Sequence, residues 1–181
     1  MRVLIIGPSG SGKSYLARKL SQIYQAPHIE LDKIWLKYGG RSLYRTKPDE
    51  LIAEKDSLRD NILGEVKSLT KGKDWVVDGN YSYVRDALLD KADRVILINF
   101  TKSTAIGNLI KRQLRGENRR RGYNLSDFVF HLPRALKNHS RSSQKLQQSI
   151  ASHKDVVVLT DKTEINSYIA FERHNRDNIK P

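Results

Sequence analysis

The sequence predicts an α/β protein whose mainly parallel sheet is covered by helices on both faces. Five short apolar runs punctuate the chain, helical patterns lie between them, and a glycine-rich loop joins the first run to the first helix. Strands that alternate with helices imply right-handed crossovers, which produce parallel sheets of this kind. A chain of 181 residues is close to the size of one domain, so we expect a single domain over residues 1–181.

Each apolar run is an expected strand. Three of the five are near-continuous Val, Ile and Leu, which is typical of strands buried on both faces. The runs are RVLIIG at 2–7, HIELD at 28–32, WVVDGN at 75–80, RVILINF at 94–100 and DVVVLTD at 155–161.

Apolar residues at helical spacing predict the helices between these strands. The first helix is expected to begin near Lys13, and a second, with a long apolar stripe, follows Pro48. Ser103 and Thr163 are expected to cap two later helices. A basic helix between those two, SDFVFHLPRALKNHS, contains Pro133, which should kink or interrupt it.

Three stretches depart from this alternation. Residues 33–47 are polar and aromatic with a Gly-Gly pair, and we interpret them as a mobile loop on the substrate side. Residues 116–125 place glycines around an arginine cluster, a composition expected of a hinged lid. The final residues, 172–181, are expected to form a frayed tail.

The loop GPSGSGKS at residues 7–14 fills every fixed position of the phosphate-binding pattern G-x-x-x-x-G-K-[ST]. Its glycines let backbone N–H groups converge on a polyphosphate, and the following helix points its positive end at the anion. Lys13 is expected to reach the β- and γ-phosphates, and the Ser14 hydroxyl to ligate Mg²⁺. A plain glycine-rich turn is the alternative, but the motif requires a strand before it and a helix after it, and both are predicted. The expected nucleotide-binding residues are Gly7, Pro8, Ser9, Gly10, Ser11, Gly12, Lys13, Ser14 and Tyr15.

Two aspartates end expected strands, at the edge where open α/β sheets bind their ligands. Asp78 is expected to hold Mg²⁺ with Ser14, although Asp-Gly is also a common turn pair. Asp32 could orient or deprotonate an acceptor hydroxyl, help to hold the metal, or be an ordinary residue at a strand end.

The net charge of +13 is concentrated in one segment. Residues 101–154 hold twelve Lys and Arg but two Asp and Glu, a footprint for the phosphate of a nucleotide, a small anion or a nucleic acid. Arg115 lies near a helix end, where a cation also offsets the helix dipole. The adjacent arginines 119–121 repel one another unless an anion or solvent offsets them, and arginine suits phosphoryl transfer.

Composition excludes several other classes of protein. The chain has no cysteine, so disulfides and thiolate chemistry are excluded, and its five histidines show no zinc-ligand spacing. No apolar stretch approaches the ~20 residues that span a bilayer, and the first strand begins too early for a signal peptide. We expect a soluble, cytoplasmic monomer or homodimer that does not bind membranes.

Four segments resemble, in this order, the P-loop proteins called DNA topology modulation proteins: GPSGSGKS, HIELDKIW, WVVDGNYS and the arginine-rich segment after VILINF. Those proteins are similar to adenylate kinase and other small nucleoside-monophosphate kinases. The resemblance covers nearly the whole chain. It implies a five-stranded parallel sheet in the order 2-3-1-4-5, an acceptor-side region near residues 33–70 and a lid near 116–125. It also implies that Asp78 is the Walker B carboxylate.

One feature departs from the adenylate kinases. After the Asp-Gly pair those enzymes have an aromatic residue, a proline and an arginine that binds the acceptor phosphate. This chain has Asn80, Tyr81 and Ser82 there, and the identity of the acceptor stays open. The residues expected to line the acceptor side are Asp32, Trp35, Asn80 and Arg85.

The leading hypothesis is a Mg²⁺-dependent, ATP-using phosphotransferase that acts on a small, undetermined acceptor. Its candidate catalytic residues are Lys13, Asp32, Arg115, Arg119 and Arg120, and its metal ligands are Ser14 and Asp78. One alternative is a nucleotide-gated regulator whose basic segment at 101–154 binds nucleic acid. Another is a simple NTPase whose lid closes on water. The few aromatic residues of the lid, chiefly Tyr123, disfavour binding to single strands by stacking.

Overall fold

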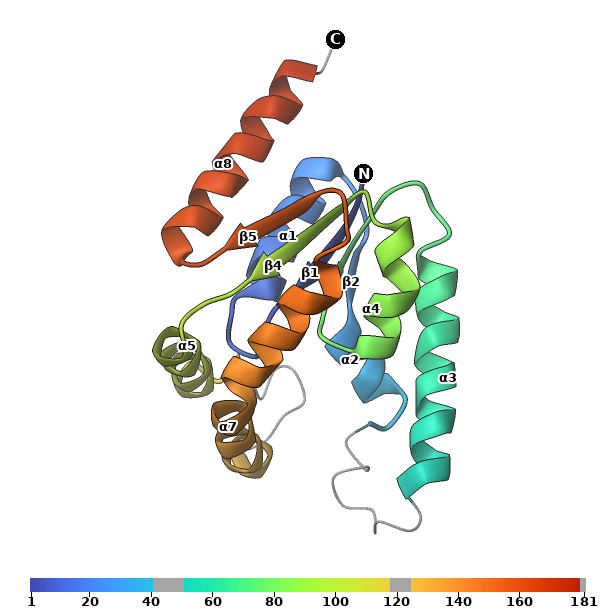
Figure 1. Cartoon of the computed structure of the whole chain (residues 1–181), viewed down its shortest axis with the longest axis vertical. Coiled ribbons are helices and arrows are strands. Elements are labelled where there is room, and N and C mark those ends of the chain that lie inside the picture. The colour runs from blue at the N-terminus through green and yellow to red at the C-terminus, as the bar shows by residue number, and fades with distance from the viewer. Residues whose placement is uncertain (41–50, 118–124, 180–181) are drawn as a thin grey trace.

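The computed structural model describes residues 1–40, 51–117 and 125–179. Its centre is a sheet of five parallel strands in the order β2-β3-β1-β4-β5 (Figure 1). The strands are β1 (Arg2–Ile6), β2 (His28–Glu30), β3 (Trp75–Asp78), β4 (Arg94–Ile98) and β5 (Val156–Leu159). Both the predicted fold class and the predicted strand order are confirmed.

Helices cover both faces of this sheet. They are α1 (Lys13–Tyr24), α2 (Leu31–Lys37), α3 (Leu51–Leu69), α4 (Ser82–Leu88), α5 (Lys102–Leu114), α7 (Leu125–Ile150) and α8 (Lys162–Ile179), with a short 3₁₀ helix at Leu89–Lys91. None of the helices within the described residues is long and apolar enough to cross a membrane.

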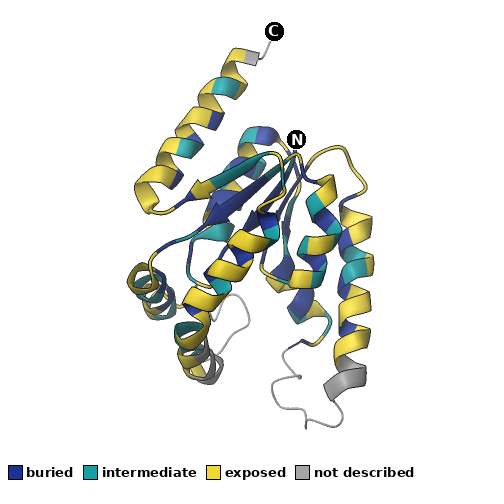
Figure 2. Ribbon diagram, viewed as in Figure 1, coloured by how far each residue is buried: buried dark blue, intermediate teal, exposed yellow. Residues whose placement is uncertain are grey.

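The core has two halves, one on each face of the sheet, and Figure 2 shows the buried residues gathered along the strands. Side chains alternate along a strand, so Leu4 and Ile6 of β1 face one side while Val3 and Ile5 face the other. Residues of α2, α3, α4 and α7 complete the first half, and residues of α1 and α8 complete the second.

Helix α2 replaces the first part of the loop expected at residues 33–47. The sequence predicts that Asp32 ends a strand. It lies instead in the first turn of α2. The helix buries one apolar face in the core, formed by Leu31, Ile34 and Trp35. This packing stabilises an element that is too short to be stable alone. The rest of the expected loop, from residue 41 onward, lies outside the described residues.

Two helices begin earlier than the sequence predicted. Thr101 caps α5 in place of Ser103, since its hydroxyl accepts a backbone N–H three residues later at 3.4 Å. Asp161 caps α8 in place of Thr163, and its carboxylate accepts the N–H of Glu164 at 2.9 Å. Each cap precedes the predicted residue, which lies inside the first turn.

Helix α8 continues to Ile179, so most of residues 172–181 are helical and do not form the expected frayed tail. Glu172 explains why this part of the helix is ordered. Its buried carboxylate accepts hydrogen bonds from the Tyr24 hydroxyl at 2.7 Å and from the Arg94 guanidinium at 2.6 Å. These contacts fasten α8 to α1 and β4.

Two further helices differ from expectation. Helix α7 runs without a break from Leu125 to Ile150, so Pro133 does not interrupt it. Helix α4 was not predicted, and it packs through Val84 and Leu88. Its seven residues place only these two apolar side chains at helical spacing, a signal too weak to read from the sequence.

Candidate functional site

The phosphate-binding loop, residues 7–14, connects β1 to α1 at the carboxyl edge of the sheet. Gly10 has a φ of +82°, and a Cβ atom there would lie 2.3 Å from the carbonyl oxygen of Ala105. Gly7 approaches β4 as closely, because its Cβ would lie 2.4 Å from the carbonyl oxygen of Ile98. Only glycine fits these two positions, and its lack of a side chain lets the loop pack directly against β4 and α5.

Lys13 begins α1, and its ammonium group lies within the loop. Nζ donates hydrogen bonds to the carbonyl oxygens of Gly7 and Pro8, both at 2.9 Å. On the side facing α5, the amide of Asn108 donates to the carbonyl oxygen of Gly10 at 2.9 Å and ties the loop to that helix. The lysine charge and the positive end of α1 lie in one loop, an arrangement that suits an anion.

Ser14 and Asp78, the two predicted metal ligands, are in contact. The Ser14 hydroxyl donates to Asp78 Oδ2 at 2.7 Å, although 64 residues separate them in the chain. The pairing of β1 with β3 explains this, because Asp78 lies opposite Ile5, near the end of the strand that leads into the loop. Asp78 is 4 % exposed, so its carboxylate is held nearly out of water.

His28 is a site residue that the sequence did not reveal. Its Nε2 atom lies 2.6 Å from the second oxygen of Asp78, Oδ1, where an imidazole N–H can donate. Its Nδ1 atom lies 3.9 Å from Glu30 Oε1, which also pairs with Lys33 at 2.6 Å. Both oxygens of Asp78 are therefore held by neighbours, which fixes the orientation of the carboxylate. Only the register of β2 against β3 brings His28 within reach.

Asp32 and Tyr81 meet on the expected acceptor side. The Tyr81 hydroxyl donates to Asp32 Oδ1 at 3.1 Å, and the Asp32 side chain is exposed. Nearby in the chain, the Asn80 amide lies 3.5 Å from the hydroxyl of Ser142 on α7. The structure therefore places Asp32 where a solvent-borne acceptor can reach it.

The other two predicted acceptor residues are less accessible. Trp35 is 7 % exposed and packs in the core, with its ring so close to Gly40 that a Cβ there would lie 2.2 Å away. Trp35 therefore has a packing role in the core, and its assignment to the acceptor side stays a prediction. Arg85 lies on α4, where its Nε donates to Asp86 at 3.2 Å and its side chain is 14 % exposed.

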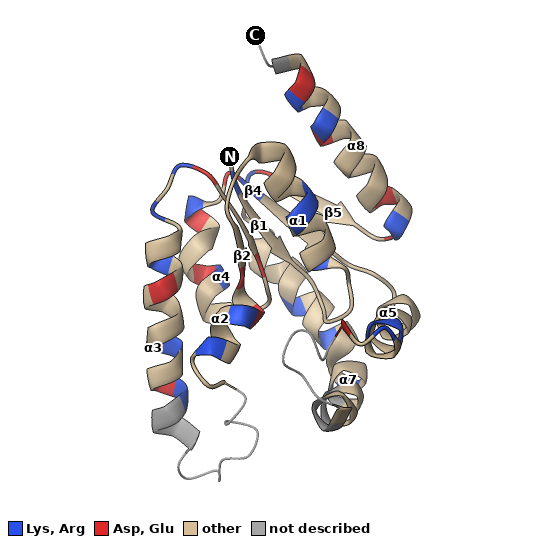
Figure 3. Cartoon of the chain, turned by 180° about the vertical axis from the view of Figure 1, so that it is seen from behind, with Lys and Arg blue, Asp and Glu red and all other residues tan. Residues whose placement is uncertain are grey.

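Of the three arginines predicted to be catalytic, the structure describes Arg115 but not Arg119 or Arg120. Arg115 ends α5 with its side chain largely exposed and 3.9 Å from Glu117. Arg119, Arg120 and Arg121 lie outside the described residues, so the lid at 116–125 stays a prediction. Within the described chain, Lys and Arg are distributed over several helices and lie at both ends of the sheet (Figure 3).

The end of β4 carries polar contacts with α7. The Asn99 side-chain oxygen accepts a hydrogen bond from the Ser143 hydroxyl. One turn earlier on α7, His139 is buried, and this burial together with the charge of Lys102 lowers the pKa of its imidazole. Helix α7 therefore presents neutral polar groups to the carboxyl edge of the sheet.

These residues fit a nucleotide with its magnesium ion. Mg²⁺ is usually held by one or two protein oxygens, phosphate oxygens and water. The Ser14 hydroxyl and the Asp78 carboxylate supply two such oxygens 2.7 Å apart. The loop glycines and Lys13 lie on the same loop as Ser14, where phosphates would be needed.

Part of the sequence is similar to a known enzyme. No family model matches the chain. An adenylate kinase of Xanthomonas campestris pv. campestris (strain B100) is 32% identical over 80 residues, which span 44% of this chain and 43% of that protein. The chain thus covers less than half the length of this curated relative.

Solved structures of kinases match nearly the whole chain. Deoxyadenosine kinase from M. mycoides, solved with the products dCMP and dCDP, matches with a TM-score of 0.62 at 10% identity, over 99% of this chain and 100% of the other. Shikimate kinase from Bacteroides thetaiotaomicron matches with a TM-score of 0.52 at 14% identity, over 98% of each chain. None of these similarities bears on the DNA topology modulation proteins, and that resemblance stays a prediction. The chain has the α/β fold of the small P-loop kinases, with a five-stranded parallel sheet and surrounding helices.

Proposed function

We propose that this protein is a Mg²⁺-dependent kinase that transfers the γ-phosphoryl group of ATP to a hydroxyl group of a small acceptor. The contact between Ser14 and Asp78 carries the proposal. It joins the hydroxyl of a phosphate-binding loop to a buried carboxylate at the carboxyl edge of a parallel sheet. That pair of oxygens beside a lysine is the arrangement that ATP with Mg²⁺ requires.

The loop and its neighbours would hold the donor nucleotide. Lys13 and the loop N–H groups would bind the β- and γ-phosphates, and Ser14 and Asp78 would hold Mg²⁺, which offsets phosphate charge when bound. His28 contributes indirectly, because its contact with Asp78 Oδ1 at 2.6 Å keeps Oδ2 turned toward Ser14. We therefore treat His28 as a positioning residue.

Asp32 is the residue that we assign to the acceptor. Its carboxylate is exposed and is oriented by the Tyr81 hydroxyl at 3.1 Å. During transfer the acceptor oxygen forms a bond to the γ-phosphorus, and the bond from that phosphorus to the bridging oxygen of ADP breaks. The proton of the acceptor hydroxyl passes to the Asp32 carboxylate and then to water.

Two observations favour a hydroxyl acceptor over a nucleoside monophosphate. The chain has Asn80, Tyr81 and Ser82 where adenylate kinases have an aromatic residue, a proline and an arginine that binds the acceptor phosphate. In addition, two solved kinases with this fold are named for deoxyadenosine and shikimate, which are hydroxyl-bearing small molecules. The proposal is tested by offering ATP and Mg²⁺ with a panel of nucleosides, small polyols and nucleoside monophosphates. Phosphorylation of a hydroxyl compound supports it, and transfer only to monophosphates contradicts it.

Replacing Asp78 tests the metal site directly. Asp78→Asn keeps the shape of the side chain but removes its charge, so we expect ATP to bind while the transfer rate falls about 10²-fold or more. The matched control is Asp60→Asn, which removes an exposed carboxylate on α3 and should leave the rate unchanged. Rates are measured with the acceptor found in the panel, and ATP binding by calorimetry. Full activity of Asp78→Asn would move the metal role to another carboxylate.

A further inference from the structure

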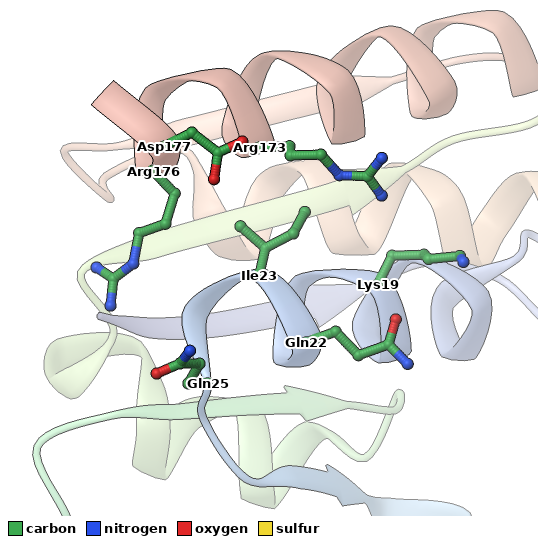
Figure 4. A pocket seen from close by; sticks show the side chains of 7 residues that line it. All are labelled: Lys19, Gln22, Ile23, Gln25, Arg173, Arg176 and Asp177. Atoms are coloured by element: carbon green, nitrogen blue, oxygen red, sulfur yellow. The ribbon is translucent and has the colours of Figure 1, made fainter. Parts of the chain in front are cut away.

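A second cluster of cations lies away from the phosphate-binding loop, between the later turns of α1 and the end of α8. It lines a pocket with a volume of about 260 Å³ (Figure 4). The lining residues are Lys19, Gln22, Ile23 and Gln25, from α1 and its end, and Arg173, Arg176 and Asp177 from α8. None of them belongs to the proposed kinase site.

The charges of this pocket are only partly balanced by the protein. Three cations and one carboxylate line it, so the lining carries a net charge of +2, and of the three cations Arg176 also interacts with the carboxylate of Asp74 outside the lining. Within the described residues, neither Lys19 nor Arg173 makes a hydrogen bond or an ion pair with another side chain. The nearby Glu172 does not neutralise them, since its two oxygens already accept from Tyr24 and Arg94. Cationic side chains whose charge is not paired within the protein attract an anion.

The side chains are arranged at two ends of the pocket. Figure 4 shows Lys19 and Arg173 extending toward one end, beside Gln22, and Arg176 lying near Gln25 at the other. Lysine and arginine can donate to the same phosphate group, and a glutamine amide adds a neutral donor. Glu172 of α8 accepts hydrogen bonds from Tyr24 of α1 and from Arg94 of β4, and these contacts fix the pocket walls.

We propose that this pocket is a second anion site, and that it binds a small phosphate-bearing molecule with at least two negative charges. The net charge of the lining requires two charges, which a phosphate monoester or a pyrophosphate group supplies near neutral pH. The volume of the pocket, about 260 Å³, lies just below the ~300 Å³ that is typical of the smallest ligand pockets. A concave pocket of this size suits a compact ligand better than an extended nucleic acid strand.

Inorganic pyrophosphate is the probe for this site. We would titrate it into the full-length protein at about 150 mM salt and follow backbone amide signals by NMR, because this separates the two sites. We expect shifts at residues 22–25 and 173–177 as well as at the phosphate-binding loop. Lys13→Ala should weaken binding at the loop and leave the pocket signals responding as before, so a failure of the kinase proposal does not affect this result.

Variants of the pocket give the decisive comparison. Lys19→Gln and Arg173→Gln should each weaken binding at the pocket by about tenfold or more, since each removes a charged donor. Arg18→Gln, which removes an exposed cation from the same helix outside the pocket, should leave the affinity within about twofold. Melting curves establish that all three variants are folded, as expected for changes at the surface.

Three results would overturn the proposal. The first is the absence of pocket shifts with pyrophosphate, and the second is equal weakening by Arg18→Gln, which would mean non-specific attraction. The third is tighter binding of another anion in place of pyrophosphate. Succinate, a dianion without phosphate, would then indicate a carboxylate site, and a single-stranded oligonucleotide would indicate a nucleic acid surface.

Discussion

At the scale of single residues, the candidate site depends on side chains that are held from several directions. Asp78 has one oxygen bonded to Ser14 and the other to His28, at 2.7 and 2.6 Å. Such a carboxylate loses no side-chain freedom when a metal binds, and this preorganisation favours binding. Asp32, by contrast, has one hydrogen bond to Tyr81 and is otherwise exposed, which suits the contact with an incoming acceptor that we propose for it.

Gly10 supports a prediction about the stability of the loop. Gly10→Ala places a Cβ atom 2.3 Å from the carbonyl oxygen of Ala105, at a φ of +82°. We expect the free energy of unfolding to fall by about 1–3 kcal/mol and ATP binding to weaken with it. Urea unfolding followed by circular dichroism measures the change.

The control for Gly10→Ala lies on α3. Gly64→Ala is at an exposed helical position with no atom within 4 Å of the new Cβ, and it should raise the free energy of unfolding by about 0.5–1 kcal/mol. Equal effects of the two substitutions would mean that the loop relaxes and that the close approach to Ala105 has no energetic weight.

The sequence predicts some of these residues and not others for a physical reason. Lys13, Ser14 and the glycines follow from local spacing, because a loop before a helix can be recognised within fourteen residues. Asp78 follows from its place at a strand end. His28 could not be predicted, since its contact with Asp78 depends on the register of two strands distant in sequence.

At the scale of elements, α8 is held in place by a partly buried network of hydrogen bonds. Arg94 on β4 donates to Asp155, to the Tyr168 hydroxyl and to Glu172, at 2.9, 3.0 and 2.6 Å. Tyr24 on α1 completes the network through Glu172. Every member has a partner, so the network fixes one position of α8 and also shapes the pocket between α1 and α8.

This network predicts a loss of stability in alkali. Burial raises the pKa of Tyr168 to about 12 and raises that of Tyr24 above its ordinary value as well. The folded state therefore holds protons that the unfolded state releases near pH ~10, and stability must fall as pH rises from about 10 toward 12. Below pH ~10 this contribution is fully present.

Tyrosine variants isolate that effect from the titration of lysines. Tyr24→Phe should lower the free energy of unfolding at pH ~8, through the lost hydrogen bond to Glu172, but should show a shallower decline above pH ~10. Tyr15→Phe, at a 44% exposed position, should decline as the wild type does. Urea unfolding at several pH values measures both, and parallel curves for all three proteins would refute the assignment.

Elements with strong sequence signals are the ones that the sequence predicts correctly. The strands are apolar runs, and α1 has a full stripe of apolar residues on one face. Helices α2 and α4 have seven residues each, and their stability comes from packing against the core. Residues such as Trp35 and Val84 have partners only in the folded chain, and so a local pattern cannot reveal these helices.

At the scale of the whole molecule, the positive charge is compatible with two kinds of ligand, ATP and nucleic acid. The chain carries a net charge of +13, most of it within residues 101–154. Such a surface attracts any polyanion, whether ATP or a nucleic acid backbone. The kinase proposal assigns part of this charge to the lid arginines 119–121, whereas the regulator alternative assigns it to nucleic acid.

Replacing the lid arginines by alanine separates these two assignments. If arginines 119–121 act on the transferring group, the triple variant should lose up to about 10³- to 10⁵-fold in transfer rate while its affinity for ATP changes little. The reason is that these contacts would form mainly as the lid closes. The measurement is the transfer rate with the acceptor found in the panel, together with ATP binding by calorimetry.

The control removes the same number of charges elsewhere in the basic segment. Lys137, Arg141 and Lys145 are exposed on α7, and replacing all three with alanine should leave the transfer rate within a few-fold of the wild type. Nucleic acid binding by the basic segment predicts a different pattern: both triple variants should then bind an oligonucleotide more weakly than the wild type, with a smaller dependence of affinity on salt. Tight, salt-sensitive binding of nucleic acid by the wild type, with ATP turnover unchanged in the 119–121 variant, would favour the regulator over the kinase.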